Sequence, residues 1–191
     1  VLGRSNKFFI RFCEKIFCYS DKIINLPNKY TNKISVIPAL LRKRFYDTKK
    51  AKDIDQYINL LIIGGSQGAK IFDTLIKTPI IELSKRHNIK IYQQTNLVNF
   101  ENLKTFYKNN NIDCKLFDYN EDISNIMSKA NICLTRAGAS TLAELVFLNL
   151  PCVAIPLPTS KDNHQFENAF FYNKIGCIWI LNENEIDDET M

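Results

Sequence analysis

The residues whose types and spacing suggest chemistry lie in Thr135-Arg-Ala-Gly-Ala-Ser-Thr-Leu-Ala-Glu144. This segment follows the strand-like run Ile132–Leu134, and its pattern predicts a helix that opens at Ser140-Thr141. Such a junction presents free backbone N–H groups and the positive end of a helix dipole, which together favour a phosphate. Glu144, one turn into the helix, is placed to accept hydrogen bonds from a ribose. The segment predicts a phosphate site beside an acceptor for sugar hydroxyls.

Two further polar segments follow apolar runs. Upstream, Leu60-Leu-Ile-Ile-Gly-Gly-Ser-Gln-Gly-Ala69 is a second strand–glycine–helix junction, and downstream lies Lys161-Asp-Asn-His-Gln165. Ligands of parallel sheets bind at the carboxyl ends of the strands. Because all three segments follow strands, we expect them at one edge of one sheet.

The glycine segment Gly64-Gly-Ser-Gln-Gly68 does not fit a generic dinucleotide site. Ser66 stands where the second glycine of G-x-G-x-x-G belongs, and the next strand, Lys90–Gln94, ends without the acidic residue that would hold an adenosine ribose. An NAD site is therefore disfavoured. Taken alone, the motif fits equally well a tight turn that needs glycines for its φ angles.

Glu144 and Arg136 also have structural explanations. Thr141-Leu-Ala-Glu144 fits a capping box, in which the glutamate accepts a bond from the cap residue's own N–H, and on spacing alone this is the better explanation. Arg136 is suited either to a phosphate or to a surface carboxylate.

The downstream segment divides in the same way. Asp162 and Asn163 are expected to cap the helix that follows them. His164 and Gln165 have no evident capping role and are freer to contact a ligand.

Composition is that of an ordinary globular protein of 191 residues with a net charge of +5. No apolar run has the length of a membrane span, and the basic run that begins at Arg42-Lys43-Arg44 fits a solvated linker better than a nucleic-acid patch. No CxxC pair occurs, and His87 and His164 are isolated, so we expect no metal site and no cofactor. The six cysteines are expected to be free thiols in a reducing cytosol.

From Tyr57 onward, strand-like and helix-like segments alternate, which predicts a Rossmann-like α/β domain of about six parallel strands with helices on both faces. The expected strands are 57–63, 89–93, 113–117, 131–134, 152–155 and 177–181. The expected helices are about 69–86, 97–107, 124–129, 141–148 and 165–174.

The N-terminal part is less regular. Residues 4–18 are amphipathic and aromatic, with a short strand expected over 33–37 and a polar linker over 42–56. Two uses of residues 4–18 are open, packing against another domain or resting on an anionic membrane surface, and packing is favoured. The chain starts with Val1 and stops at Met191 after an acidic stretch, so we expect a fragment at both ends.

Three separated segments match one family in order and spacing. Ile63-Gly-Gly-Ser-Gln-Gly-Ala69, Arg136–Glu144, and Ile155-Pro-Leu-Pro through Asp162-Asn-His-Gln165 with Asn168-Ala169 resemble the C-terminal half of the MurG-type transferases of glycosyltransferase family 28. The resemblance covers roughly residues 1–181 and is strong from about residue 58.

The resemblance implies a GT-B fold, here a remnant of the N-terminal domain (1–42), an interdomain linker (43–56) and a UDP-sugar donor-binding domain (57–191) truncated at its C-terminal end. It implies inverting transfer of N-acetylglucosamine from UDP-N-acetylglucosamine to undecaprenyl-pyrophosphoryl-N-acetylmuramoyl-pentapeptide (lipid I) in peptidoglycan synthesis. It also implies a cytoplasmic protein, peripheral on the inner face of the cell membrane. No nucleic-acid partner is expected.

By matching position, Ser66 would touch a donor phosphate, Asn120 would lie where a backbone group contacts the uracil edge, and Arg136 would line the nucleotide pocket. The turn around the helix start would hold the phosphates, Glu144 the ribose, and His164 with Gln165 the sugar hydroxyls. The residues of that turn are Ala139, Ser140, Thr141, Leu142 and Ala143.

The chain departs from the family pattern before residue 57. The family's Asn-Pro-Val-Arg segment appears only as Ile37-Pro-Ala-Leu-Leu-Arg42, which puts a role for Arg42 in doubt, and the glycine-rich N-terminal domain is absent. By the resemblance, that domain carries the acceptor surface and catalytic base, so no catalytic residue is expected in this chain. The alternative is a non-catalytic nucleotide-sugar binding module or a degraded gene product.

Overall fold

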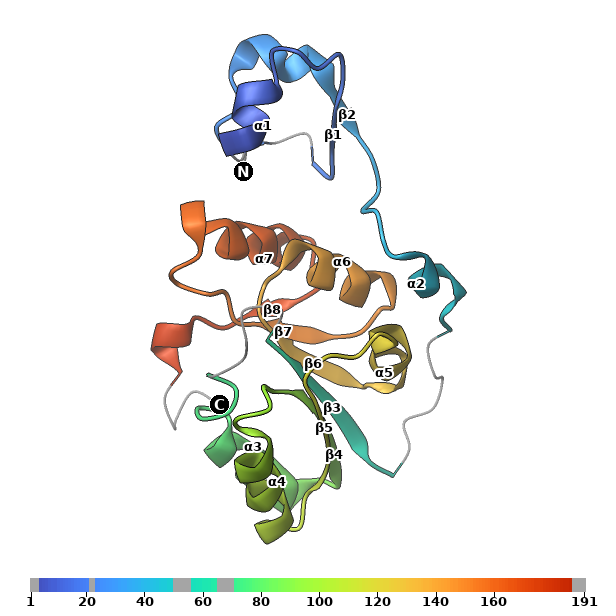
Figure 1. Cartoon of the computed structure of the whole chain (residues 1–191), viewed down its shortest axis with the longest axis vertical. Coiled ribbons are helices and arrows are strands. Elements are labelled where there is room, and N and C mark those ends of the chain that lie inside the picture. Colours follow the sequence, from blue (N-terminus) through green and yellow to red (C-terminus); the bar gives the residue numbers. More distant parts are fainter. Residues whose placement is uncertain (1–3, 21–22, 50–55, 65–70, 187–191) are drawn as a thin grey trace. The chain divides into compact units, whose positions relative to one another are not determined.

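The computed structural model describes residues 4–20, 23–49, 56–64 and 71–186 (Figure 1). The chain forms two compact units, Val1–Leu41 and Arg42–Met191. Within the described ranges, no helix is both long and apolar enough to cross a membrane.

The first unit is small and has little core. Helix α1 (Arg4–Phe9) precedes strand β1 (Ile16–Cys18), and a 3-10 turn, η1 (Asn28–Lys33), leads into strand β2 (Ile34–Val36), which pairs in parallel with β1. The amphipathic segment 4–18 is thus helical only in its first part. Its Phe8, Phe9 and Phe12 remain exposed.

The described residues of the second unit form a six-stranded, all-parallel sheet in the order β5-β4-β3-β6-β7-β8. Its strands are β3 (Ile58–Ile63), β4 (Ile89–Gln94), β5 (Asp113–Phe117), β6 (Ile132–Thr135), β7 (Cys152–Ala154) and β8 (Trp179–Ile180). In chain order this is the 3-2-1-4-5-6 arrangement of doubly wound folds. The predicted fold class and strand count are confirmed.

Helices cover both faces of this sheet because the chain leaves β3 in one direction and returns past it in the other. With right-handed crossovers, α3 and α4 fall on one face and α5, α6 and α7 on the other (Figure 1). The helices are α2 (Lys43–Asp47), α3 (Lys77–Arg86), α4 (Phe100–Asn109), α5 (Ile123–Lys129), α6 (Ala139–Phe147) and α7 (His164–Lys174), with 3-10 turns η2 (Lys161–Asn163) and η3 (Glu183–Glu185).

The core lies between the central strands and their helices. Leu61, Ile62 and Ile91 are fully buried, as expected for strands that are covered on both faces. Phe72 and Tyr107 close the core on the side of α3 and α4.

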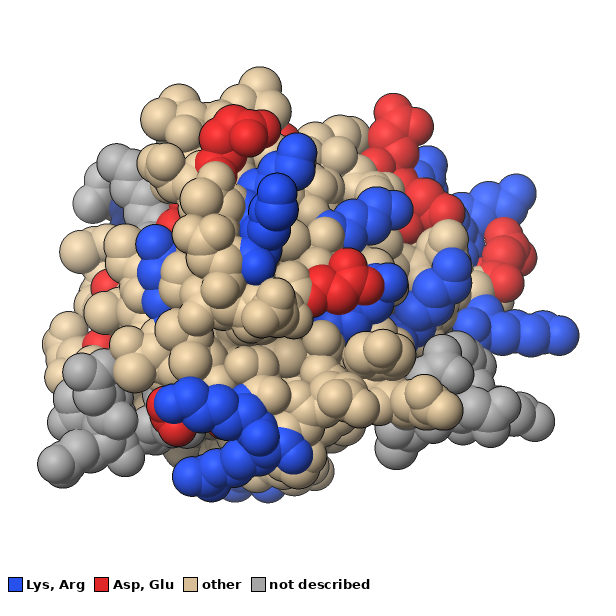
Figure 2. Space-filling model, turned by 90° about the horizontal axis from the view of Figure 1, so that it is seen from below, with Lys and Arg blue, Asp and Glu red and all other residues tan. Residues whose placement is uncertain are grey.

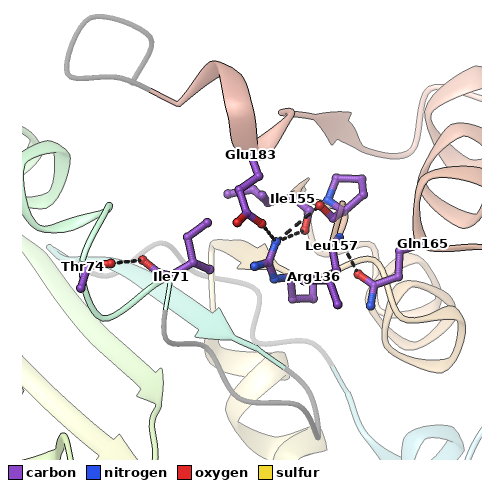
Figure 3. A network of polar contacts seen from close by, with 8 residues as sticks. Ile71, Thr74, Arg136, Ile155, Leu157, Gln165 and Glu183 are labelled. Carbon is purple, nitrogen blue, oxygen red and sulfur yellow. Dashed lines mark hydrogen bonds and ion pairs between the residues drawn. The ribbon is translucent and has the colours of Figure 1, made fainter. Parts of the chain in front are cut away.

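The helix predicted over about 69–86 begins later, at Lys77. Residues 71–76 form turns instead, in which the Thr74 hydroxyl donates to the Ile71 carbonyl at 3.2 Å, so this side chain competes with regular helix bonding (Figure 3). Asp73, from the same turns, accepts hydrogen bonds from Gln93 of strand β4 and from Thr95, the residue after that strand ends. These contacts reach across the fold and could not be expected from the local sequence.

Residues 43–47, which lie in the segment expected to be a linker, form α2. Its Phe45 is fully buried, and the Tyr46 ring meets Phe147 of α6 edge-on at 5.4 Å between centroids. Helix α2 therefore packs as part of the second unit, against α6.

Candidate functional site

The predicted polar segments converge at the point where the strand order reverses. Strands β3 and β6 are neighbours in register, with Ile63 opposite Thr135, and the Arg136 N–H donates to the Ile63 carbonyl at 3.2 Å. Gly64 and Gly138 therefore follow adjacent strands at the carboxyl edge. Open α/β sheets bind ligands in the crevice at such a switch point.

The N-terminus of α6 opens into this edge without a side-chain cap. Its N-cap residue is Gly138, and the first intrahelical bond runs from the Leu142 N–H to the Gly138 carbonyl at 3.0 Å. The amides of Ala139, Ser140 and Thr141 precede that bond and have no acceptor within the helix. They are the groups that an anion would meet.

The local backbone does not require glycine at position 138. Gly138 has φ −68° and ψ 134°, which any residue adopts, and among the described residues an added Cβ would meet only Thr141 Oγ1, at 3.6 Å. As far as the described residues go, the missing side chain leaves space beside the helix terminus. This is the arrangement needed when a ligand must approach the backbone closely.

Two residues of the predicted turn lie away from that space. Leu142 and Ala143 are buried in the core below α6, whereas Ala139 and Ser140 are exposed. The outer face of the turn thus consists of the first three residues of the helix.

The capping-box explanation of Glu144 is wrong. Because α6 starts at Ala139, Thr141 lies inside the first turn and is not the N-cap residue. The Glu144 carboxylate instead accepts two bonds from Arg42, from Nε at 2.8 Å and from Nη2 at 2.9 Å. It is almost completely buried.

Arg136 is buried and lies at the carboxyl edge of the sheet, where its side chain bonds to the neighbouring loops (Figure 3). Its Nη1 donates to the carbonyls of Ile155 and Pro156 at 3.2 and 3.4 Å and pairs with Glu183 Oε2 at 2.5 Å. Its guanidinium also lies 5.5 Å from the centre of the Phe72 ring. Arg136 therefore links the ends of β6 and β7 to η3, and its charge is matched by a carboxylate of the protein.

Gln165 and His164 begin α7, on the next loop of the same edge. Gln165 Oε1 accepts a bond from the Leu157 N–H at 3.0 Å (Figure 3), which leaves its NH2 group with no acceptor among the described residues. The exposed His164 has Nδ1 2.6 Å from the Lys161 carbonyl oxygen. Asn168 donates to the Ala137 carbonyl at 3.1 Å and so ties α7 to the loop before α6.

The predicted side-chain caps of α7 are wrong. Asn163 is the N-cap residue but makes no side-chain cap bond, and both it and Asp162 have left-handed backbones, with φ of 53° and 52°. A capping side chain needs an extended backbone to reach the amides of the first turn.

Asn120 lies on the other wing of the sheet. It follows β5, and its Oδ1 accepts a bond from the Asp122 N–H at 2.7 Å. Three strand spacings separate β5 from β6, about 14 Å. Ser66 lies outside the described residues.

One buried group near the site was not predicted. The Asp73 carboxylate accepts bonds from Gln93, Thr95 and Asn99 at 2.9, 3.0 and 2.7 Å, and Tyr107 donates its hydroxyl to Gln93. This network joins the segment after the glycine loop to the carboxyl end of β4. Polar residues at a strand end were the only signal for it in the sequence.

Charged side chains do not form one basic band on the face shown in Figure 2, where Lys and Arg lie at separate places with Asp and Glu among them. Two of the ion pairs of the second unit, Lys85 with Glu82 and Lys90 with Asp113, lie at its surface. Such pairs contribute little to stability.

Comparison with known proteins gives a consistent family. Residues 59–191 match the model of the glycosyltransferase family 28 C-terminal domain. The whole chain is 62% identical to a Pelagibacter ubique protein and 36% identical to a Rickettsia bellii protein, each named UDP-N-acetylglucosamine–N-acetylmuramyl-(pentapeptide) pyrophosphoryl-undecaprenol N-acetylglucosamine transferase. It covers 54% and 55% of those proteins, so the chain spans about half the length of the curated relatives it matches.

Solved structures agree. The crystal structure of Acinetobacter baumannii MurG matches 76% of this chain and 41% of its own, with a TM-score of 0.66 and 28% identity. The glycosyltransferase WaaG shares the fold, with a TM-score of 0.54 and 17% identity. The sheet is thus of the Rossmann-like kind found in GT-B glycosyltransferases, and the chain belongs to glycosyltransferase family 28, whose C-terminal domain it carries.

Proposed function

We propose that this chain is the donor-binding part of an inverting hexosyltransferase that moves N-acetylglucosamine from UDP-N-acetylglucosamine to undecaprenyl-pyrophosphoryl-N-acetylmuramoyl-pentapeptide. The names of the relatives that it matches along its full length support this donor and acceptor. The observation that carries the proposal is the glycine-capped N-terminus of α6 at the switch point, with the Glu144 carboxylate one turn further in.

In this proposal the donor pyrophosphate lies against the amides of Ala139, Ser140 and Thr141. The helix terminus stabilises the negative charge that grows on the leaving UDP as the glycosidic bond breaks. Gly138 leaves room for the phosphate to approach, and Ser66 contributes a further phosphate contact.

The Glu144 carboxylate accepts hydrogen bonds from ribose hydroxyls. Gln165 and His164 contact hydroxyls of the N-acetylglucosamine. The NH2 group of Gln165 supports its role, since the oxygen of the same side chain is already held by Leu157. Arg136 supports the site indirectly, because it holds the ends of β6 and β7 to η3. A backbone group at Asn120 contacts the uracil.

Binding of nucleotides to the 191-residue chain, measured by isothermal titration calorimetry, tests the proposal. UDP and UDP-N-acetylglucosamine should bind, and ADP and GDP should bind more weakly. Glu144→Ala should weaken UDP binding by about 1–3 kcal/mol, as expected for the loss of hydrogen bonds to a charged group. The matched control is Glu101→Ala, which removes an exposed carboxylate from the first turn of α4.

A different outcome would separate structure from function. If Glu144→Ala lowers the melting temperature but leaves the UDP affinity unchanged, Glu144 serves only to hold Arg42. If neither UDP nor UDP-N-acetylglucosamine binds, the donor site is not formed by these residues.

We also propose that the lipid-linked acceptor brings the protein to the cytoplasmic face of the membrane. In support, α1 and the residues after it expose Phe8 and Phe12, with the Arg11 guanidinium 5.0 Å from the centre of each ring. Phe8→Ser with Phe12→Ser should reduce co-sedimentation with vesicles that contain phosphatidylglycerol. Equal sedimentation of the variant would instead favour packing against another protein surface.

A further inference from the structure

Arg42 holds the buried carboxylate of Glu144 from the outside. The side chain of Glu144 is 5% exposed and that of Arg42 is 50% exposed. Nε meets Oε1 at 2.8 Å and Nη2 meets Oε2 at 2.9 Å, so the planar guanidinium lies across both carboxylate oxygens. A bidentate pair of this kind fixes orientation as well as distance.

The position of Arg42 is set by the packing of α2. Arg42 is the N-cap residue of that helix, and its carbonyl accepts the Phe45 N–H at 2.9 Å. Phe45 is fully buried, and the Arg42 guanidinium lies 5.2 Å from the centre of its ring. The ring contact between Tyr46 and Phe147 adds a second attachment one turn along α6 from Glu144.

This pair leaves acceptor capacity on the carboxylate. An ionised carboxylate has about four lone-pair sites on its two oxygens. Arg42 uses one site on each oxygen. Among the described residues no other donor contacts the carboxylate, so one further site on each oxygen remains. These two sites point to opposite sides of the carboxylate, so each can accept one hydroxyl but they cannot accept a vicinal pair together.

We propose that Arg42 is a positioning residue that orients Glu144 to accept a hydrogen bond from a hydroxyl of the donor ribose and so sets the preference for ribose over a dideoxyribose. The inference rests on the proposed function, that UDP binds at this edge. Arg42, the first residue of the second unit, would thereby influence ribose selection through Glu144 of α6.

The test compares UDP with 2′,3′-dideoxyuridine diphosphate, which lacks both hydroxyls. The ratio of their dissociation constants measures what Glu144 gains from the hydroxyls. It does not depend on the fraction of folded protein, because both ligands are titrated into the same sample. A variant that is partly unfolded therefore still gives an interpretable result.

The variant Arg42→Lys keeps the charge but cannot bridge both oxygens. It should weaken UDP binding by roughly tenfold and leave the dideoxy ligand within about twofold, so that the ratio approaches that of Glu144→Ala. The double variant, Arg42→Lys with Glu144→Ala, should have the same ratio of dissociation constants as Glu144→Ala alone. The matched control is Arg44→Lys, a basic residue of α2 itself, which should leave the ratio unchanged.

Three results would overturn the inference. An equal loss for both ligands would mean that Arg42 contacts the phosphates or acts through the fold. Unchanged affinities for both ligands would mean that Glu144 needs no positioning, and tighter UDP binding would mean that Arg42 competes with the ribose. Failure of the unmodified chain to bind UDP would contradict the proposed function itself.

Discussion

Removal of the Asp73 carboxylate should destabilise the second unit more than its single side chain suggests. Asp73 is 5% exposed, and its carboxylate accepts three hydrogen bonds, from Gln93, Thr95 and Asn99. Asp73→Ala removes the acceptor of all three donors at once. The cost depends on how many of these donors can find another partner.

The three donors differ in this respect. Thr95 is 2% exposed, so its hydroxyl would be left in the interior. Gln93 is fully buried, but its NH2 group also donates to the Phe72 carbonyl at 3.3 Å and keeps that bond, while Asn99 is only partly buried and can reach water. At about 1–3 kcal/mol for each stranded buried donor, one complete and one partial loss amount to roughly 2–4 kcal/mol.

Urea denaturation followed by far-UV circular dichroism measures this difference. The matched control is Asp113→Ala, which removes an exposed carboxylate paired with Lys90 at 2.8 Å and should cost less than about 1 kcal/mol. If Asp73→Ala and Asp113→Ala lower the free energy of unfolding by the same amount, the hydrogen bonds of Asp73 do not hold residues 71–76 to β4.

Three further predictions follow from individual side chains. Gly138→Ala should change stability by less than about 1 kcal/mol, because among the described residues only Thr141 Oγ1 lies near the new Cβ. It should weaken UDP binding roughly tenfold by filling the space through which the phosphate approaches, and an unchanged affinity would place the phosphate elsewhere. Burial raises the pKa of Cys152 to about 12 and that of Cys133 well above its ordinary value. Their thiols should therefore react with Ellman's reagent at pH 8 only after unfolding, and rapid modification of both in the native protein would show that the sheet opens. Because the unfolded thiols lose protons near pH 9 while the folded ones keep them, stability should fall between about pH 9 and 12, by about 1.4 kcal/mol per pH unit for each thiol, and urea midpoints that are level from pH 8 to 10 would contradict this.

The strands and their order of appearance could be predicted from the sequence because they are short β-branched or apolar segments that alternate with helix-like ones, as β3 and β6 show. Ile58–Ile63 and Asp113–Phe117 agree with the expected strands to within a residue. The start of α3 could not be predicted, since Asp73 is bound by Gln93 at the end of β4 and by Thr95 just after it, about 20 residues further along the chain. Local propensity carries no information about such contacts.

The candidate site was predictable in place but not in detail. Parallel strands bring their carboxyl ends together, so Gly64 and Gly138 had to meet at one edge. The partner of Glu144, by contrast, lies 102 residues away in sequence, and its spacing from Thr141 suggested a cap that does not form. The cap does not form because Gly138, and not Thr141, is the N-cap residue. The sequence pattern could not locate the start of this helix to within two residues.

Binding of the donor nucleotide at the N-terminus of α6 is tested most directly by amide hydrogen exchange with and without UDP-N-acetylglucosamine. We expect slower exchange of the backbone amides of Ala139, Ser140 and Thr141 at saturating ligand, because these N–H groups would donate to the pyrophosphate. Saturable binding with protection confined to the opposite edge of the sheet, at the hollow lined by Leu150 and Ile178, would contradict it.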